Sequence, residues 1–347
     1  MTTPTLPASR ADAVASAKAF LGAQSRVRPL EIAFWLLAFA ALFVGRSHHL
    51  LLAEITILAL FAVSLDLILG YAGIVSLGHT AFFGLGAYAA GLLARDLVSE
   101  PVTGLVFAGL VSGLFGFATS FLVLRGSDLT RLMTTFGVAM LLAEVANQAA
   151  WLTGGADGLS GVTITPILGL FKFDLWGRTG YIYALLVLMA LTYVARRIVH
   201  SPFGLSLKAI KRNSRRAAML GISADHRIVA IYTLSAAYAG IVGALLTQTT
   251  SFVSPDVLAF HRSADVLLVL VIGGVGYLYG GLVGAVIFSV LRDWLSVITP
   301  QYWMFWIGLI LIVIVLVGRE RLGRWRDFLP GAGSAARDRA TAKEDGR

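Results

Sequence analysis

Long apolar runs alternate with short polar stretches through most of the chain. Runs of about 20 residues have the length of a helix that crosses the roughly 30 Å hydrocarbon core of a bilayer. The pattern predicts an all-α, polytopic integral membrane protein with about eight to ten membrane-embedded helices. The predicted helices cover residues 30–44, 50–69, 71–94, 102–124, 132–152, 181–194, 228–251, 265–291 and 303–317.

Composition and charge support this class of protein. Hydrophobic residues make up 57% of the 347 residues and charged residues 14%, whereas soluble proteins carry about a quarter charged residues. The net charge is +9, and most lysines and arginines lie in residues 1–30, 196–227 and 319–347. Because positive charge collects on the cytoplasmic side of membrane proteins, this distribution indicates membrane topology and argues against a nucleic-acid partner.

The same distribution divides the chain into regions. We expect a cytoplasmic N-terminal tail at residues 1–28, a transmembrane domain at 29–318 with a cytoplasmic loop at 196–227, and a basic cytoplasmic tail at 319–347. No signal-peptide pattern precedes the first apolar run. A multi-pass protein of a bacterial inner membrane, with both termini in the cytoplasm, is therefore expected. The chain contains no cysteine, which excludes disulfides and thiolate metal sites.

Each membrane-crossing helix places the next loop on the opposite side of the membrane, and this rule meets a conflict at residues 265–291. A single crossing there would place the arginine-rich tail outside, against the positive-inside rule. The stretch is too long for one untilted span and too short for two full ones. We therefore expect two half-helices that meet near residues 273–281, in a place where protein or water satisfies the freed backbone groups.

Two glycine-rich segments lie in opposite halves of the chain. Small residues at four-residue spacing let helices pack closely, which fits Gly276, Gly280 and Gly284, and also Gly109 with Gly113. Paired glycine-interrupted segments also point to a translocation path in transporters, and the first segment adds polar and aromatic side chains. No metal-ligand cluster accompanies its histidine, so no metal site is predicted. The residues predicted to line or gate a path are Gly70, Tyr71, Gly73, Ser76, Gly78, His79, Phe82, Phe83, Tyr88, Gly273, Gly274, Gly276 and Gly280.

Three acidic residues, Glu54, Asp66 and Glu144, lie within apolar runs. A charge at the bilayer centre costs about 2.5–3.5 kcal/mol on insertion scales, and such residues can mark a proton or substrate path. Only Glu144 is expected well inside its helix. An ion-coupled secondary transporter that depends on Glu144 is the alternative function. A membrane scaffold without transport activity is a third possibility, and it would lose nothing on substitution of Ser76 or His79.

The basic loop, residues 196–227, has a helical pattern of its own. Ser201 before Pro202 predicts a helix start, and Leu205, Ala209 and Ile210 give that helix an apolar face. A glycine at position 221 predicts the end of a second short helix. Anionic lipid head groups would satisfy the positive charge alone, but an apolar face beside charges fits the docking of a cytoplasmic protein.

Four ordered motifs resemble those of one protein family. They are GYAGIVSLGHTAFFGLGAYAAGLL within residues 65–93, TGGADGLSG at 153–161, the loop at 201–222 and the glycine-rich segment at 272–284. Together they are similar to branched-chain amino acid ABC permeases of the LivM kind. The resemblance covers most of residues 50–317, and the order of the four motifs makes it specific.

The resemblance implies a permease subunit of a binding-protein-dependent ABC importer for branched-chain amino acids or related small polar or organic-acid solutes. It further implies a second, LivH-like permease, two ATP-binding subunits, a periplasmic binding protein and surrounding lipid as partners. ATP and Mg²⁺ would bind the ATP-binding subunits, since this chain carries no phosphate-binding loop motif. The chain itself would be a transport subunit without a cofactor of its own, and not an enzyme.

The resemblance also implies where the ATP-binding subunits are coupled. The implied coupling residues are Lys208, Lys211, Arg212, Arg215, Arg216, Ala217, Ala218, Leu220, Gly221 and Ile222. The family usually has acidic residues before the alanine pair, whereas this chain has Arg212, Ser214, Arg215 and Arg216 there. We therefore expect acidic residues on the partner. The choice of substrate, which the binding protein largely sets, is not predicted.

Overall fold

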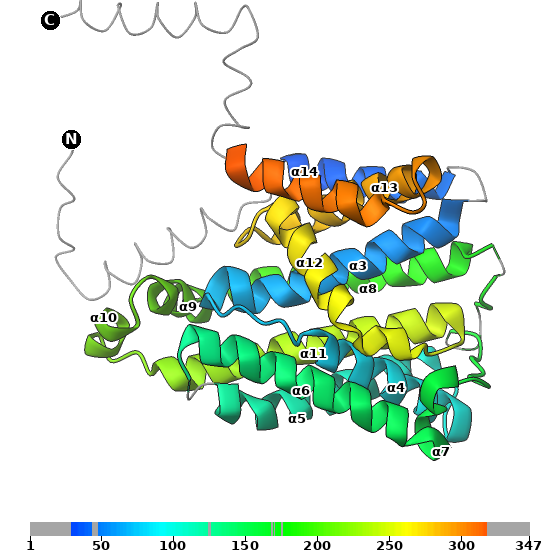
Figure 1. Cartoon of the computed structure of the whole chain (residues 1–347), viewed down its shortest axis with the longest axis horizontal. Helices are drawn as coiled ribbons and strands as arrows, with labels where there is room; N and C mark the ends of the chain where they lie inside the picture. Colours follow the sequence, from blue (N-terminus) through cyan, green and yellow to red (C-terminus); the bar gives the residue numbers. More distant parts are fainter. Residues whose placement is uncertain are drawn as a thin grey trace, which may run out of the picture. The chain divides into compact units, whose positions relative to one another are not determined.

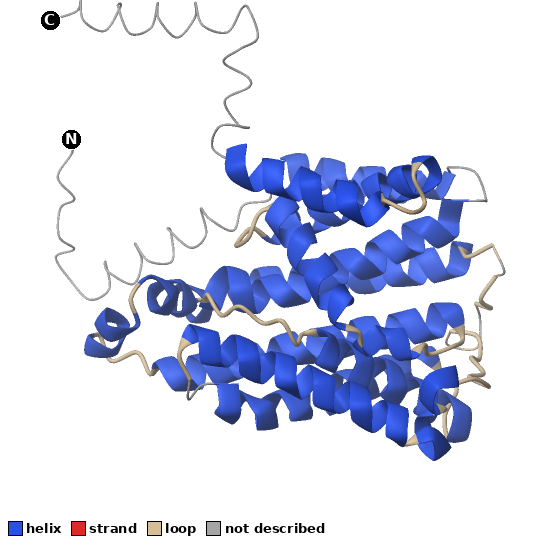
Figure 2. Ribbon diagram, in the orientation of Figure 1, coloured by secondary structure: helices blue, strands red, loops and turns tan. Residues whose placement is uncertain are grey.

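The computed structural model describes residues 29–43, 48–123, 126–167, 169, 171–174 and 176–317. Within these ranges helices dominate, and the pairing of extended backbone is limited to two isolated bridges, which confirms the all-α class (Figure 2). The tails expected at 1–28 and 319–347 lie outside the described residues. The chain forms two compact units that meet in sequence between Ile287 and Phe288, inside helix α13 (Leu278–Ile298).

The first unit contains most of the helices. In chain order they are α2 (Pro29–Ala40), α3 (His49–Asp66), α4 (Thr80–Asp96), α5 (Pro101–Val123), α6 (Asp128–Gln148), α7 (Ala150–Thr153), α8 (Arg178–Val199), α9 (Pro202–Arg212), α10 (Ser214–Met219), α11 (Ala224–Thr250), α12 (Phe260–Gly273) and the start of α13. The second unit holds the rest of α13 and α14 (Trp303–Val317). In the described part of the chain, six helices are long and apolar enough to cross a membrane: α3 with its extension, α5, α6, α8, α11 and α13.

Helix α11 is the centre of the first unit and packs against α3, α4 and α5. Glycines make the closest approach possible, because a Cβ on Gly86 of α4 would clash with the backbone of Gly240 in α11. The predicted packing role of Gly109 and Gly113 is confirmed, since both lie against side chains of α11. Figure 1 shows α3, α5, α6, α8 and α11 running in roughly one direction, with α9 and α10 at one end and α7 at the other.

The predicted helix at 71–94 is wrong in its first part. Helix α3 continues through a π-helical turn, Leu67–Ala72, and the chain is then non-helical until α4 begins at Thr80. Gly73 ends the turn in the left-handed region, with φ of 77°, which glycine adopts without a steric penalty. The apolar composition of this stretch continues across the break, so it hid the point at which the helix stops.

The predicted break within 265–291 is confirmed, but the pieces are longer than expected. Helix α12 ends at Gly273, and α13 begins at Leu278. Helix α13 continues to Ile298 and is long enough to cross a membrane, so it is not a half-helix. The prediction was too short because Arg292 and Asp293 ended the apolar run without ending the helix.

Candidate functional site

The break between α3 and α4 carries buried polar groups. Residues 73–79 leave the π turn beside α9 and lead back among the helices to the start of α4 (Figures 1 and 2). Backbone without a helical partner is tolerated at membrane depth only where protein or water surrounds it. Within the segment, Ile74 and Ser76 are buried by protein, whereas Gly73 and Val75 are exposed on this chain.

His79 ends this segment and is fully buried. Its Nε2 lies 2.9 Å from the hydroxyl of Ser64, and its ring stacks on Phe61 with centroids 5.5 Å apart. The Ser64 hydroxyl donates to the carbonyl of Phe61, so His79 donates from Nε2 to Ser64. The carbonyl of Ser64 in turn accepts a hydrogen bond from Ser235 of α11. His79 therefore ties the break to α3 and, through Ser64, to α11.

Other polar contacts join the same segment to α12 and α6. The backbone N–H of Thr80 donates to Oγ of Ser263 at 3.2 Å, so α12 caps the start of α4. Gly78 lies against the backbone of Thr135 in α6, where a Cβ would clash. The hydroxyl of Ser76 is buried and has no hydrogen-bond partner among the described residues. An unpaired buried hydroxyl is costly, so it is a candidate contact for water or solute.

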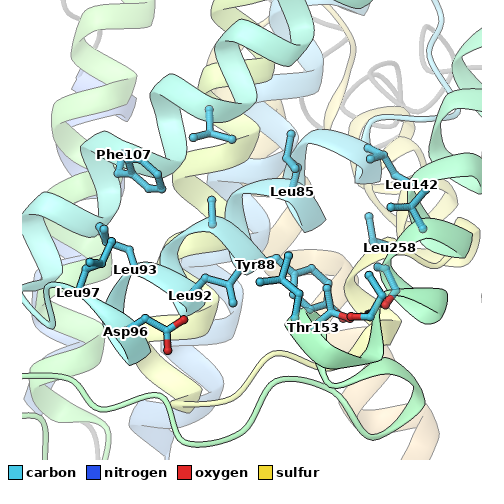
Figure 3. A pocket seen from close by; sticks show the side chains of 16 residues that line it. Leu85, Tyr88, Leu92, Leu93, Asp96, Leu97, Phe107, Leu142, Thr153 and Leu258 are labelled. Carbon is cyan, nitrogen blue, oxygen red and sulfur yellow. Dashed lines mark hydrogen bonds between the residues drawn. The ribbon is translucent and has the colours of Figure 1, made fainter.

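The remaining aromatic residues predicted in this segment lie in two different places. Phe82 and Phe83 are buried in the helix packing, where Phe82 meets the ring of Tyr232 edge-on at 5.5 Å. Tyr88 faces a cavity of about 420 Å³ between α4, α5, α6 and α7 (Figure 3). Its hydroxyl has no hydrogen-bond partner among the described residues. The structure therefore separates Tyr88 from the His79 cluster with which the sequence grouped it.

The second glycine-rich segment forms a tight turn between α12 and α13. Gly274 and Gly276 have φ of 102° and 82°, and Gly273 packs against the carbonyl of Gly280 so closely that a Cβ would clash. The turn reaches the first break, because the N–H of Gly276 donates to Oδ1 of Asp66 at 2.7 Å. The two segments predicted separately from the sequence therefore touch.

The two short helices predicted in the basic loop are confirmed as α9 and α10. Ser201 caps α9 by accepting from the N–H of Gly204. Asn213 caps α10, where its Oδ1 accepts from the N–H of Arg216 at 3.0 Å. After α10 the chain turns at Gly221, with φ of 78°.

The predicted apolar face of α9 is partly wrong. Leu207 and Ile210 are buried, whereas Leu205 and Ala209 are half-buried. The buried side meets the π turn, which lies outside the loop's own sequence, and α11, which begins near the end of the loop at Ala224. A helical pattern in eleven residues therefore gave the type of element but not its orientation.

The predicted coupling residues divide into an outer and an inner group. The outer group is exposed and contains Arg212, Arg215, Arg216, Ala218, Leu220 and Gly221, together with Met219, which was not predicted. Two large apolar side chains in it, Met219 and Leu220, are each 79% exposed beside the arginines. Ala217 is buried and Ile222 half-buried. Lys208, which is half-buried, and Lys211, which is exposed, form the inner group because both contact the π turn. Partial burial lowers the pKa of Lys208.

The three acids within apolar runs have different surroundings. Asp66 is fully buried, whereas Glu54 and Glu144 are exposed on this chain. Glu144 lies one turn before the end of α6 and accepts a hydrogen bond from Gln148 at 2.7 Å. The expectation that Glu144 lies well inside its helix is therefore wrong, because α6 ends before the apolar run does. No group of three metal-binding side chains occurs among the described residues.

Sequence reasoning missed several residues of this site. Ser64 and Ser235 hold the His79 cluster, and Asp66 was considered only as an isolated acid. One available signal was the pair of polar residues, Ser64 and Asp66, close together near the end of an otherwise apolar run. The link between Lys211 and Gly70, 141 residues apart, had no local signal.

Comparisons with known proteins identify the family of this sequence. A family model described as the branched-chain amino acid transport system / permease component matches residues 49–315. The chain is 27% identical over 278 residues to the high-affinity branched-chain amino acid transport system permease protein LivM of Salmonella typhimurium, which covers 74% of this chain and 65% of that protein. It is 26% identical over 307 residues to LivM of Escherichia coli, covering 82% of this chain and 72% of that protein.

A second kind of permease is also related. The chain is 21% identical over 285 residues to the permease protein LivH of Salmonella typhimurium, covering 75% of this chain and 88% of that protein. No solved structure matches the chain significantly. Because the family model matches well over half of the chain, the chain belongs to the family of branched-chain amino acid transport system permease components.

Proposed function

We propose that the chain is a pore-forming permease subunit of a binding-protein-dependent ABC importer for branched-chain amino acids or related small polar or organic-acid solutes. The observation that carries this proposal is the family match over residues 49–315. The two helix breaks that touch at Gly276 and Asp66 support it, because interrupted helices line or gate the paths of transporters.

The rest of the importer follows from the same proposal. The solute enters from a periplasmic binding protein, and two ATP-binding subunits dock on the basic loop, bind ATP with Mg²⁺ and close on it. The basic loop then moves the helices to which it is joined. Both termini lie in the cytoplasm, in keeping with the positive charge of the basic loop and the tails.

Helix α6 supports the pairing with a second, LivH-like permease. Only 17% of its most apolar stretch is buried in this chain, against 78% for α3. Beyond its first turn, the exposed residues recur every three or four positions. The exposed residues of α6 are Asp128, Leu129, Thr130, Met133, Gly137, Met140, Leu141, Glu144, Val145, Asn147 and Gln148. Polar groups that face lipid are costly. We infer that this stripe faces the second permease across the path.

Cross-linking from α6 tests this pairing. The chain has no cysteine, so Met140→Cys takes a single benzophenone maleimide before the complex is reassembled. We expect ultraviolet light to join it to the second permease. Met189→Cys on α8, which is also exposed, is the matched control and should join mainly to lipid. Equal yields from both positions would contradict the assignment of the α6 stripe.

The importer itself is tested by purification from the native membrane in mild detergent, with mass spectrometry of the proteins that accompany the chain. We expect ATP-binding subunits and a second permease, and ATP-dependent uptake of labelled leucine when the complex is placed in liposomes with its binding protein. Uptake driven by an ion gradient, with the chain purified alone, would contradict the proposal and favour a secondary transporter.

Substitution of Ser76 separates transport from structure. Because its hydroxyl is buried without a partner among the described residues, we expect that Ser76→Ala does not lower the melting temperature. If the hydroxyl contacts solute or water in the path, uptake falls about tenfold, the effect of one lost hydrogen bond. Ser120→Ala, which removes a buried hydroxyl already bonded to Phe117, should leave uptake unchanged. Normal uptake by Ser76→Ala would exclude Ser76 from the path.

A further inference from the structure

The basic loop is fastened to the end of α3 by Lys211. This residue lies in the last turn of α9, and its Nζ donates to the carbonyl oxygen of Gly70 at 2.7 Å. Gly70 belongs to the π turn that ends α3, and the last carbonyls of a helix have no partner within the helix. A cation at this end also complements the helix dipole. Lys211 therefore caps α3 from a segment far away in the sequence.

Two further features fit α9 to this turn. A Cβ on Gly73 would lie 2.8 Å from Cγ of Lys211, so only glycine leaves room for the lysine stem. One turn earlier in α9, Nζ of Lys208 lies 5.5 Å from the centroid of the Tyr71 ring, within the range of a cation–π interaction. Helix α9 therefore holds the π turn at two neighbouring points.

Asp66 joins the same turn to the second helix break. Its Oδ1 accepts a hydrogen bond from the backbone N–H of Gly276 at 2.7 Å. Gly70 is packed between these groups, because a Cβ there would clash with the Asp66 carboxylate and lie 2.7 Å from the nitrogen of Gly276. Asp66 is fully buried, and a hydrogen bond to a carboxylate is stronger than one between neutral groups. One continuous set of contacts therefore runs from α9 through the π turn to the α12–α13 turn.

We propose that Lys211 and Asp66 are positioning residues that make α9, the π turn and the α12–α13 turn move as one piece. This inference rests on the proposed function, in which ATP-binding subunits move the basic loop. A displacement of α9 would then reach both helix breaks at once. Without either residue, the ATP-binding subunits would still dock and hydrolyse ATP, but their motion would no longer be transmitted to the breaks.

The first test measures coupling in the full complex in liposomes, with its ATP-binding subunits and binding protein. For Lys211→Met and Asp66→Ala we expect labelled leucine uptake per ATP hydrolysed to fall at least about tenfold, with normal assembly. The double variant should be no worse than either single variant, because both residues act through one set of contacts. Lys211→Arg keeps the cationic donor and should restore most of the coupling. Lys172→Met, the same substitution at an exposed lysine elsewhere, should change nothing.

A second test leaves the contacts of Lys211 and Asp66 in place. Tyr71→Cys with Lys208→Cys places the only two cysteines of the chain on the two sides of the contact. A short flexible bismaleimide then ties them together. If the parts move as one piece, uptake per ATP is the same before and after cross-linking. A drop on cross-linking would show that they move apart during transport and would overturn the inference.

The outcomes separate the inference from the function on which it rests. A wild-type complex that takes up no solute with ATP contradicts the proposed function, and the inference falls with it. A wild-type complex that imports, with unchanged uptake per ATP in Lys211→Met and Asp66→Ala, contradicts the inference alone. Loss of assembly in both Lys211→Met and Lys211→Arg would also overturn it, because Lys211 would then be needed only for folding.

Discussion

Replacing Gly86 with valine is expected to abolish uptake and to lower the melting temperature of the purified chain by about 10 °C. Gly86 lies where α4 crosses α11, and a Cβ there would clash with the backbone of Gly240. Neither backbone can yield without moving its helix. Overpacking of this kind costs about 1–3 kcal/mol and occasionally more, and each kcal/mol shifts the melting temperature of a chain of this size by a few degrees. Thermal unfolding in detergent measures the effect.

The chain provides a matched control for this substitution. Gly137 also lies inside a long apolar helix. Apart from the nearby backbone of that helix, no described atom lies within 4 Å of the position that a Cβ would take. Gly137→Val should therefore leave the melting temperature of the isolated chain unchanged. If both variants melt at the same temperature as the wild type, the close approach of α4 and α11 is not the contact that holds the first unit together.

The double substitution Arg215→Glu with Arg216→Glu is expected to weaken binding of the ATP-binding subunits at least about 100-fold. Both arginines are exposed on α10, beside Met219 and Leu220. If the partner presents acidic residues, the reversal replaces attraction with repulsion between like charges, which costs several kcal/mol across an interface. Co-purification of the ATP-binding subunits measures the loss, and the wild-type interaction should weaken as salt rises.

Restoring the interaction tests the charge complementarity directly. Reversal of acidic residues on the ATP-binding subunit to lysine should recover co-purification with the doubly substituted chain. Lys172→Glu with Arg178→Glu, two exposed cations outside the basic loop, is the matched control and should bind the partner normally. Normal co-purification by the Arg215 and Arg216 variant would rule out α10 as a charged docking surface.

Elements with a strong local signal were predicted well from the sequence. The run at 303–317 corresponds to α14 residue for residue, and the capping pattern at Ser201 and Pro202 gave the start of α9. The predicted start of α4 was too early. Gly70, Gly73 and Gly78 break the helix through packing and backbone conformation, and apolar composition does not reveal either.

The candidate site was predicted only in its parts. Both glycine-rich segments were identified, but their contact depends on Asp66 reaching Gly276, 210 residues away in the sequence. Tyr88 was grouped with His79 because both are close in sequence, yet it faces a separate cavity. A single sequence gives the periodicity of each helix, whereas contacts between helices depend on side chains that are brought together only by the fold.

The break before α4 has a consequence for how the chain is made. Helix α4 is held by the glycines of α11 and by Ser263 of α12. All of these are synthesised long after α4 has left the ribosome. Until then, the non-helical backbone between Gly73 and His79 lacks part of the protein that surrounds it, and such backbone is costly to leave in lipid. We expect N-terminal fragments that end before α11 to be degraded, and the complete chain to insert α4 late, after its later neighbours have entered the membrane.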